Sequence, residues 1–260
     1  PGNRLEQYGG LNKLTTVSQP LGLAMLAAYV RQFGFTVAII DAEAEFLIPE
    51  QTIPLMEEYE PSLVGLSAFT TKMTAAGKVL RLYKERNPYI PCIIGGHHSS
   101  AIPERTLNEE TVDYVVKGEG FIPVTELLRR LKEKREPDGI KGLWYGKNGQ
   151  TVNGGQAEGI ADLDSLPFPA WDLLPMDKYR CHHWQTWDYN LEQAPYSVIY
   201  TSLGCPFHCD YCSVNMVYPN RRVRYRSPEK FVAELKILVE QYGVRYVEII
   251  DDTLTVNTKH

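Results

Sequence analysis

The chain has 260 residues and a mass of 29.5 kDa, enough for one large or two ordinary domains. Its formal net charge of −5 argues against a nucleic-acid scaffold held by bulk positive charge, and its 43% hydrophobic and 23% charged residues argue against disorder. No apolar run reaches the length of a membrane span, and five cysteines, three of them in one loop, do not form a secreted disulfide framework but fit a reducing cytoplasm.

Strand and helix patterns alternate along the first half of the chain. Helices are predicted at residues 21–33, 48–60, 74–88, 103–110 and 123–136, and strands at residues 36–42, 61–69, 90–98 and 112–120. Such alternation implies right-handed crossovers, so we expect an α/β fold with a Rossmann-like, doubly wound parallel sheet and helices on both faces. Because residues 1–20 form a polar, Gly-rich loop, we expect the chain to begin just after the first strand of this sheet.

Small and polar residues follow the predicted strands. They are Asp41 and residues 67–71, 95–99 and 118–121. In a sheet of this kind a ligand sits outside the carboxyl ends of the strands, which is where these residues would lie. Ordinary turns between strand and helix also need Gly and Ser, so the pattern alone leaves both interpretations open.

The middle of the chain differs from both flanks. Residues 142–155 predict a β-hairpin around Asn148-Gly149, and the Pro-rich, aromatic residues 164–175 predict a connector lying against a surface. The following segment, CHHWQTWDYN, is crowded with His and Trp. Cys181, His182 and His183 lack the spaced partners of a zinc site, so a structured linker with aromatic anchors is favoured over a metal cluster.

A second strand–helix series begins at residue 196. A strand at residues 196–204 precedes the cysteine loop, and the helix after the loop has Ser227 as its N-cap, Pro228 at its first position and Gly243 at its end. A second strand follows at residues 244–252. This is one β-α-β unit, as at the start of a parallel barrel.

The loop GCPFHCDYCS holds Cys205, Cys209 and Cys212 at the spacing C-x3-C-x2-C. Structural zinc takes four protein ligands, so the three cysteines would need a partner such as His208, which lies immediately beside Cys209 and is poorly placed to close the same site. A cubane iron–sulfur cluster has four irons, each normally held by one cysteine. Three cysteines therefore leave one iron open, where it can bind and activate a small molecule.

This loop, with the aromatic Tyr211 just before its last cysteine, resembles that of the radical S-adenosylmethionine (SAM) superfamily. The flanking sequence resembles its B12-dependent branch. Residues 20–42, 93–107 and 112–128 resemble the cobalamin-binding domain, residues 166–179 the connector, and residues 223–235 and 248–257 the barrel entry. The domains implied are a cobalamin-binding domain at 1–137, a connector with a hairpin at 138–195, and the start of a radical SAM barrel at 196–260.

The resemblance implies a [4Fe–4S] cluster that cleaves S-adenosylmethionine to a 5′-deoxyadenosyl radical, and cobalamin that helps to methylate an unreactive carbon. A cobalamin-dependent radical cyclase or rearrangement enzyme is one alternative, and a non-enzymatic zinc-binding module is another. The implied partners are a small-molecule or lipid-like substrate and a cellular one-electron reductant. Because the barrel would be cut short at residue 260, we expect no turnover from this chain alone.

The resemblance also assigns residues to each cofactor. Cys205, Cys209 and Cys212 would hold the cluster, with Gly204 and Pro206 shaping the turn. The candidates for SAM are Tyr211, Asp251 and Asp252, although one aspartate could simply cap the following turn. The candidates for cobalamin are Ser67, Thr70, Gly95, Gly96, His97, Gly118 and Glu119.

Two further features bear on these assignments. Residues 1–24, where some cobalamin domains carry a cobalt-ligating histidine, contain no His, so cobalamin is expected to bind without one. Residues 221–226 carry four arginines, which predict either a solvated loop or a site for a phosphate or carboxylate of the substrate.

Overall fold

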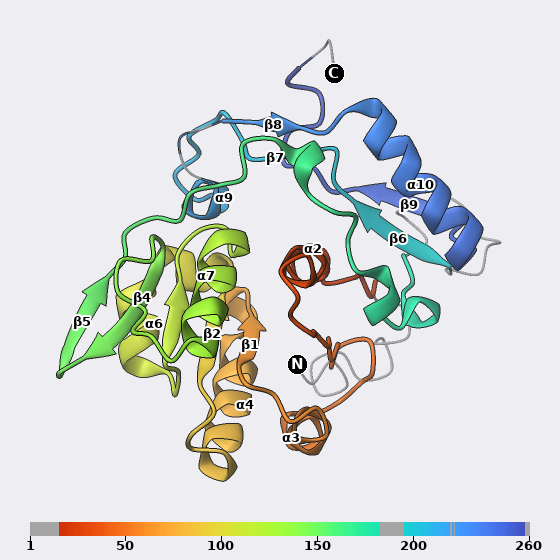
Figure 1. The fold of residues 1–260 in the computed structure, drawn as a ribbon. Helices are drawn as coiled ribbons and strands as arrows, with labels where there is room; N and C mark the ends of the chain where they lie inside the picture. Colours follow the sequence, from red (N-terminus) through yellow and green to blue (C-terminus); the bar gives the residue numbers. More distant parts are fainter. Residues whose placement is uncertain (1–15, 183–194, 219, 221, 258–260) are drawn as a thin grey trace.

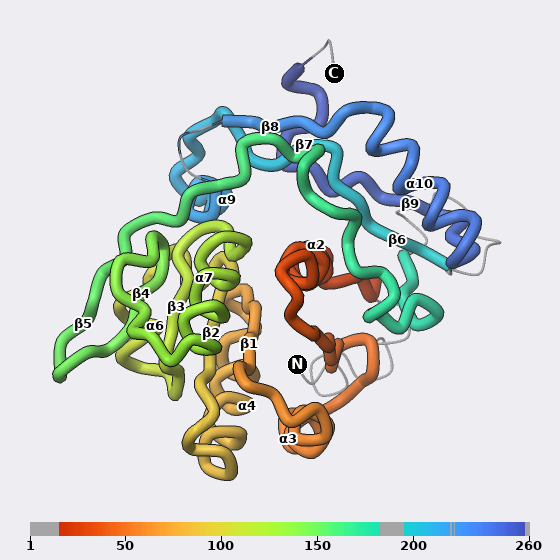
Figure 2. Tube along the Cα trace, viewed as in Figure 1, coloured from red at the N-terminus to blue at the C-terminus, as the bar shows by residue number. Residues whose placement is uncertain are grey.

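The computed structural model describes residues 16–182, 195–218, 220 and 222–257 (Figures 1 and 2). A five-stranded sheet forms the first part, and two two-stranded sheets form the C-terminal part. Helix α2 (Leu21–Arg31) lies between them. Its Leu21 and Ala24 join a core with the C-terminal strands, while its Tyr29 ring lies 5.4 Å from the ring of Phe121 on the first part.

The five-stranded sheet confirms the predicted α/β architecture. Its strands lie in the order β1 (Val64–Ser67), β2 (Cys92–Gly95), β3 (Tyr114–Val116), β4 (Leu143–Lys147) and β5 (Gln150–Asn153). The first three are parallel and the last two antiparallel. The predicted hairpin turn is confirmed, because Asn148 and Gly149 both have positive φ, +53° and +75°, as a type I′ turn requires.

Helices cover both faces of this sheet. They are α3 (Pro49–Glu57), α4 (Met73–Arg86), α5 (His97–Ala101), α6 (Pro103–Glu109) and α7 (Phe121–Lys132). On one face the buried side of α4 packs against Cys92, Ile94 and Val115. On the other face Leu127 of α7 packs against Ile93 and Val116. Neighbouring residues of one strand thus point to opposite faces, as the period of a strand requires.

Two predictions about the first half are corrected. Residues 36–42 were expected to form a strand, but they pair with no strand in the described part of the chain. Val37 and Ile39, both half-buried, pack against Ala27 and Ala28 of α2 instead, so part of the apolar surface is covered without a strand ladder. The hairpin was assigned to the connector, yet β4 pairs with β3 and extends the first sheet, because Leu143 to Tyr145 lie beside Tyr114 to Val116.

The connector lies along α2 and the C-terminal part. It contains the short 3₁₀ turns η3 (Leu163–Ser165), η4 (Trp171–Leu173) and η5 (Met176–Lys178). Trp171 and Tyr179 are buried in the core that α2 shares with the C-terminal strands, so residues 164–175 lie against a surface, as predicted. The rest of the predicted linker, residues 183–194 with His183 among them, lies outside the described residues.

The C-terminal part contains the predicted β-α-β unit. Strands β6 (Tyr196–Ile199) and β9 (Tyr246–Ile249) are parallel and joined through α10 (Pro228–Tyr242). The Ser227 hydroxyl accepts a hydrogen bond from the Lys230 N–H at 3.2 Å, and Gly243 ends the helix in the left-handed conformation, so both predicted caps are confirmed. Between β6 and α10 lie β7 (Ser202–Leu203), α9 (Val214–Val217) and β8 (Arg224–Tyr225). None of the helices in the described ranges has the length and apolarity needed to cross a bilayer.

Candidate functional site

The cysteine loop is closed at its base by a short antiparallel ribbon. Leu203 of β7 pairs with Arg224 of β8, and the loop begins at the next residue, Gly204. Gly204 has a φ of +96°, and a Cβ placed on it would lie 2.4 Å from the Arg222 carbonyl oxygen. A glycine is therefore required at this turn, both by the backbone conformation and by the close approach of the returning chain.

The three loop cysteines have accessible side chains. Cys209 is exposed, while Cys205 and Cys212 are half-buried. The Cys212 N–H donates to the Cys209 carbonyl at 3.0 Å, and the Asn215 amide donates to the Phe207 carbonyl at 2.8 Å, so the loop is internally braced. Over the described ranges, no three His, Cys, Asp or Glu side chains gather around one point that could hold a metal ion. A cubane cluster takes each thiolate on a different iron, so this donor set fits it without converging on a single point.

The other two cysteines have a different environment. Cys92 is fully buried in β2, and burial, reinforced by Asp113, raises the pKa of its thiol to about 12. Cys181 is 1% exposed, and burial raises its pKa as well. A thiol must ionise to bind a metal, so these two behave as packing residues.

We therefore expect alkylation to separate the two classes of cysteine. In cofactor-free native protein at about pH 8, a value below the raised pKa of Cys92, iodoacetamide should modify Cys205, Cys209 and Cys212 and spare Cys92 and Cys181. Peptide mass spectrometry reads out each site, and denatured protein gives the control in which all five react. Modification of Cys92 at the rate of the loop cysteines would contradict its assignment as a core residue.

Five of the seven predicted cobalamin residues come together at the carboxyl edge of β1 and β2. Ser67 and Gly95 are paired in register at the two strand ends. Gly96 follows with a φ of +102°, and a Cβ on it would lie 2.9 Å from the Ser67 hydroxyl. The set is completed by His97, which begins α5, and Thr70, whose hydroxyl lies 3.1 Å from Nδ1 of His98. His97 and His98 thus lie on a short helix, whereas the predicted strand extended to residue 98.

Gly118 and Glu119 follow β3 and face different surroundings. The Gly118 N–H donates to the Ser100 hydroxyl at 3.0 Å, and its φ of +100° and the close Ala157 explain why a glycine stands there. The buried Glu119 carboxylate accepts hydrogen bonds from Arg224 and from the Ile160 N–H.

His97 joins the sheet edge to the cysteine loop. Its ring stacks on Phe69, with centroids 5.0 Å apart, and its Nδ1 lies 3.1 Å from the hydroxyl of Ser213, the residue after Cys212. Burial lowers the pKa of His97, while Asp252 acts in the opposite direction. Residues far apart in the sequence are thus brought together where the two predicted cofactor regions face each other.

The three predicted SAM residues differ in how much they interact with other residues of the protein. Asp251 accepts hydrogen bonds from the Thr201 N–H at 2.7 Å, the Thr201 hydroxyl, and the Ser202 hydroxyl at 2.7 Å, so it ties the end of β9 to the segment before the loop. Burial of its carboxyl raises the pKa of Asp252, and His97 offsets part of this rise. Tyr211 is 93% exposed.

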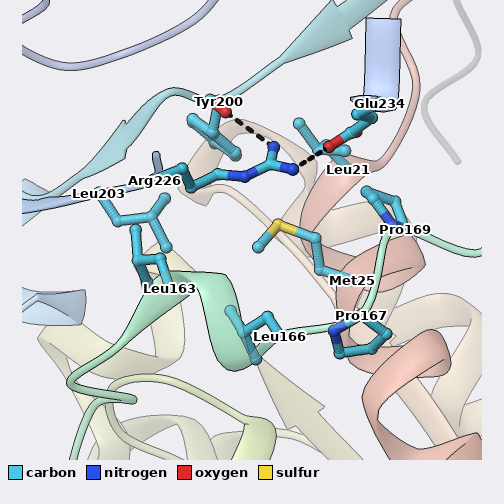
Figure 3. A pocket seen from close by; sticks show the side chains of 10 residues that line it. All are labelled: Leu21, Met25, Leu163, Leu166, Pro167, Pro169, Tyr200, Leu203, Arg226 and Glu234. Atoms are coloured by element: carbon cyan, nitrogen blue, oxygen red, sulfur yellow. Dashed lines mark hydrogen bonds and ion pairs between the residues drawn. The ribbon is translucent and has the colours of Figure 1, made fainter. Parts of the chain in front are cut away.

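Both predictions for the arginine run are wrong at Arg224 and Arg226. Arg224 forms an ion pair with Glu119, and Arg226 forms one with Glu234 of α10 at 2.5 Å. Figure 3 shows the second pair in a small, mostly apolar pocket between α2, the connector, β7 and α10, where Arg226 also donates to the Tyr200 carbonyl at 3.0 Å. Glu234 is fully buried, and nothing in the local sequence reveals such a partner. Arg221 lies outside the described residues.

Comparisons with known proteins match both halves. Residues 9–128 match the B12 binding domain, and residues 199–260 match the radical SAM superfamily. An uncharacterized methyltransferase of Pyrococcus horikoshii is 38% identical over 245 residues, which are 94% of this chain and 51% of the relative. An anaerobic magnesium-protoporphyrin IX monomethyl ester cyclase of Rubrivivax gelatinosus is 29% identical over 246 residues, 92% of this chain and 42% of the relative.

Solved structures share the fold. The radical S-adenosylmethionine methyltransferase TsrM of Kitasatospora setae, with cobalamin and a [4Fe–4S] cluster bound, superposes with a TM-score of 0.67 at 19% identity. The match covers 92% of this chain and 46% of TsrM. The chain thus spans about half the length of the curated relatives it matches.

Proposed function

We propose that this chain, which belongs to the radical SAM proteins that carry a B12-binding domain, holds two cofactors face to face for the methylation of an unreactive carbon. The observation that carries the proposal is the contact between His97 at the sheet edge and Ser213 beside the cysteine loop. A cofactor at either place would face the other across this contact. Because the chain spans about half of its relatives, the activity is proposed for the whole protein.

The chain's own residues have distinct tasks in this proposal. Cys205, Cys209 and Cys212 would hold a [4Fe–4S] cluster and leave one iron open to S-adenosylmethionine. When bound, the cluster supplies the electron that cleaves S-adenosylmethionine, and cobalamin supplies the methyl group. The ribbon of β7 and β8 fixes the two ends of the loop, and Asp251 fixes the chain just before it.

The sheet edge would receive cobalamin. Ser67, Thr70, Gly95, Gly96 and His97 present small or polar groups there, which lets a large planar ligand approach the backbone. Gly118 would contribute through its backbone. Glu119 is held by Arg224, so we assign its carboxylate to the contact between the two halves rather than to cobalamin.

For S-adenosylmethionine we favour Asp252 over Asp251. The Asp251 carboxylate is occupied by Thr201 and Ser202, which matches the capping interpretation, whereas Asp252 interacts with the backbone of Gly204, the first residue of the loop. Tyr211 is exposed and free to contact a ligand through its side chain or its backbone. We further propose a small-molecule or lipid-like substrate, a one-electron reductant and a reducing, cytoplasmic setting.

Cyclisation or rearrangement is the second candidate function. It is supported by the cyclase of Rubrivivax gelatinosus, which matches this chain over both halves. Methylation is preferred because the relative with 38% identity is a methyltransferase and so is TsrM, which shares the fold. The two functions use the same cofactors and differ in the substrate.

The proposal predicts S-adenosylmethionine cleavage by the full-length protein. After anaerobic reconstitution with iron, sulfide and cobalamin, a low-potential reductant should produce 5′-deoxyadenosine or S-adenosylhomocysteine, measured by liquid chromatography with mass detection. The variant Cys209→Ala is the control and should produce neither. Absence of both products from protein with a full cluster would refute the proposed function.

Cobalamin is predicted to bind without a protein histidine on cobalt. His97 is engaged by Phe69 and Ser213, and residues 1–24 contain no histidine. Electron paramagnetic resonance of the full-length protein with cob(II)alamin should therefore show no nitrogen splitting from a protein imidazole. A splitting that disappears in His97→Ala or His98→Ala would identify an axial histidine and contradict this prediction.

A further inference from the structure

The two ends of the cysteine loop meet at one arginine. Arg224 stands in β8 directly opposite Leu203 of β7, and the loop runs from Gly204 to Val223 between them. Any group that holds the Arg224 side chain therefore holds the base of the loop. The Tyr218 ring, on the chain returning from α9, lies 5.8 Å from the Arg224 guanidinium and adds a second contact within the loop.

The group that holds Arg224 belongs to the first half of the chain. Both guanidinium ends contact the carboxylate of Glu119, one at 3.1 Å and the other closer, which gives a forked ion pair. The Ile160 carbonyl accepts a further hydrogen bond from Arg224 at 2.6 Å, and the Ile160 N–H reaches Glu119 at 3.4 Å. Glu119 lies in the turn between β3 and α7, close to the sheet edge, and its side chain is 3% exposed.

The space around this pair is closely filled. A Cβ added to Gly159 would lie 2.5 Å from the Glu119 carboxylate and 2.7 Å from the Arg224 guanidinium. Gly159 has no positive φ, so its backbone does not require a glycine. The close approach of the ion pair is the remaining reason for a residue without a side chain here.

We propose that Glu119 and Arg224 form a positioning pair that sets the distance and angle between the cysteine loop and the carboxyl edge of the first sheet. The inference rests on the proposed function, because that edge and that loop are the proposed places of the two cofactors. Neither side chain needs to touch a cofactor for this role. A forked, buried ion pair suits this positioning role, because its two hydrogen bonds allow a smaller range of distances and angles than a flexible surface contact does.

Three variants test the pair, with a fourth as the matched control. Glu119→Gln removes the charge at nearly constant shape, Arg224→Lys keeps the charge and loses the fork, and Gly159→Ala keeps both partners and displaces them. Glu158→Gln is the control, because Glu158 precedes Gly159 in the sequence and its ion pair with Lys141 is exposed.

Hydrogen exchange of the cofactor-free, full-length protein gives the first readout. In the three test variants, amides of β7, β8 and the loop should exchange roughly tenfold faster or more, while amides of β1 and α4 keep their protection. The Glu158→Gln control should match the wild type. Unchanged exchange in β7 and β8, or a uniform loss across the protein, would overturn the proposal.

The magnetic interaction between the two cofactors gives the second readout. In protein loaded with both, the reduced cluster and cob(II)alamin each carry an unpaired spin, and their mutual line broadening depends on their separation and orientation. The test variants should load both cofactors and show an altered interaction, whereas a merely structural role would lower the loaded fraction and leave the spectrum of the loaded fraction unchanged. A protein that loads neither cofactor would refute the proposed function, and the exchange experiment would still decide on the pair.

Discussion

Replacing any one of Cys205, Cys209 and Cys212 by alanine is expected to abolish the iron–sulfur cluster. Each thiolate would be the sole protein ligand of one iron, and the described ranges contain no group of three His, Cys, Asp or Glu side chains that could hold a metal elsewhere. Iron and sulfide analysis after anaerobic reconstitution of the full-length protein, together with the visible absorbance of the cluster, measures the loss. The loop is accessible, so these variants should fold as the wild type does.

Cys92→Ala and Cys181→Ala are the matched controls. Both thiols are buried with raised pKa values, so their removal should leave the iron and sulfide content unchanged. Cys92→Ala should lower stability, because it leaves a small cavity between β2 and α4. Loss of the cluster in Cys181→Ala, or its retention in one of the three loop variants, would show that the ligand set is wrong.

Replacing Arg226 by alanine is expected to destabilise the protein strongly. Glu234 has no exposed surface, and Arg226 is the cation that contacts its carboxylate at 2.5 Å (Figure 3). Removing one partner of a buried pair leaves the other charge uncompensated, which costs ~3–5 kcal/mol. Urea unfolding at neutral pH measures the loss. Arg31→Ala removes an exposed ion pair with Asp172 and is the control, with an expected cost of about 0–1 kcal/mol.

The deficit of Arg226→Ala should depend on pH. Burial raises the pKa of Glu234, and Arg226 is the group that lowers it most. Removing Arg226 should therefore raise the pKa of Glu234 further. A carboxyl whose pKa is raised in the folded state binds a proton there that the unfolded chain releases near pH 4.3, so the stability of the folded state falls as pH rises above about that value. The deficit should therefore be smaller near pH 4–5 than near pH 8. A deficit that stays constant over this window would contradict the buried-charge explanation.

Elements with strong local signals could be predicted from the sequence. The caps at Ser227 and Gly243, the hairpin at Asn148-Gly149 and the alternation of strands and helices each depend on residues within one element or turn. The three cysteines could be found for the same reason, because their spacing lies within eight residues. Their roles remain predictions until the cluster is measured.

Features that depend on distant partners could not be predicted. Residues 36–42 have the composition of a buried strand, but a strand also needs a neighbour for its backbone groups, and local pattern does not supply that information. The arginine run looked like a solvated loop or a substrate site because neither ion-pair partner lies within it. Glu119 is 105 positions away from Arg224 in the sequence, and Glu234 lies on helix α10. The contact between His97 and Ser213 spans 116 positions and has no local signal either.

In the proposed function, the cysteine loop and the sheet edge hold two different metal cofactors in one protein. Metal analysis of the full-length protein, purified without oxygen from cells supplied with iron and cobalamin, measures both at once. We expect about four irons and about one cobalt per chain, with iron lost and cobalt retained in Cys209→Ala. One zinc per chain, with neither iron nor cobalt, would refute the proposed cofactors and support the zinc-binding alternative.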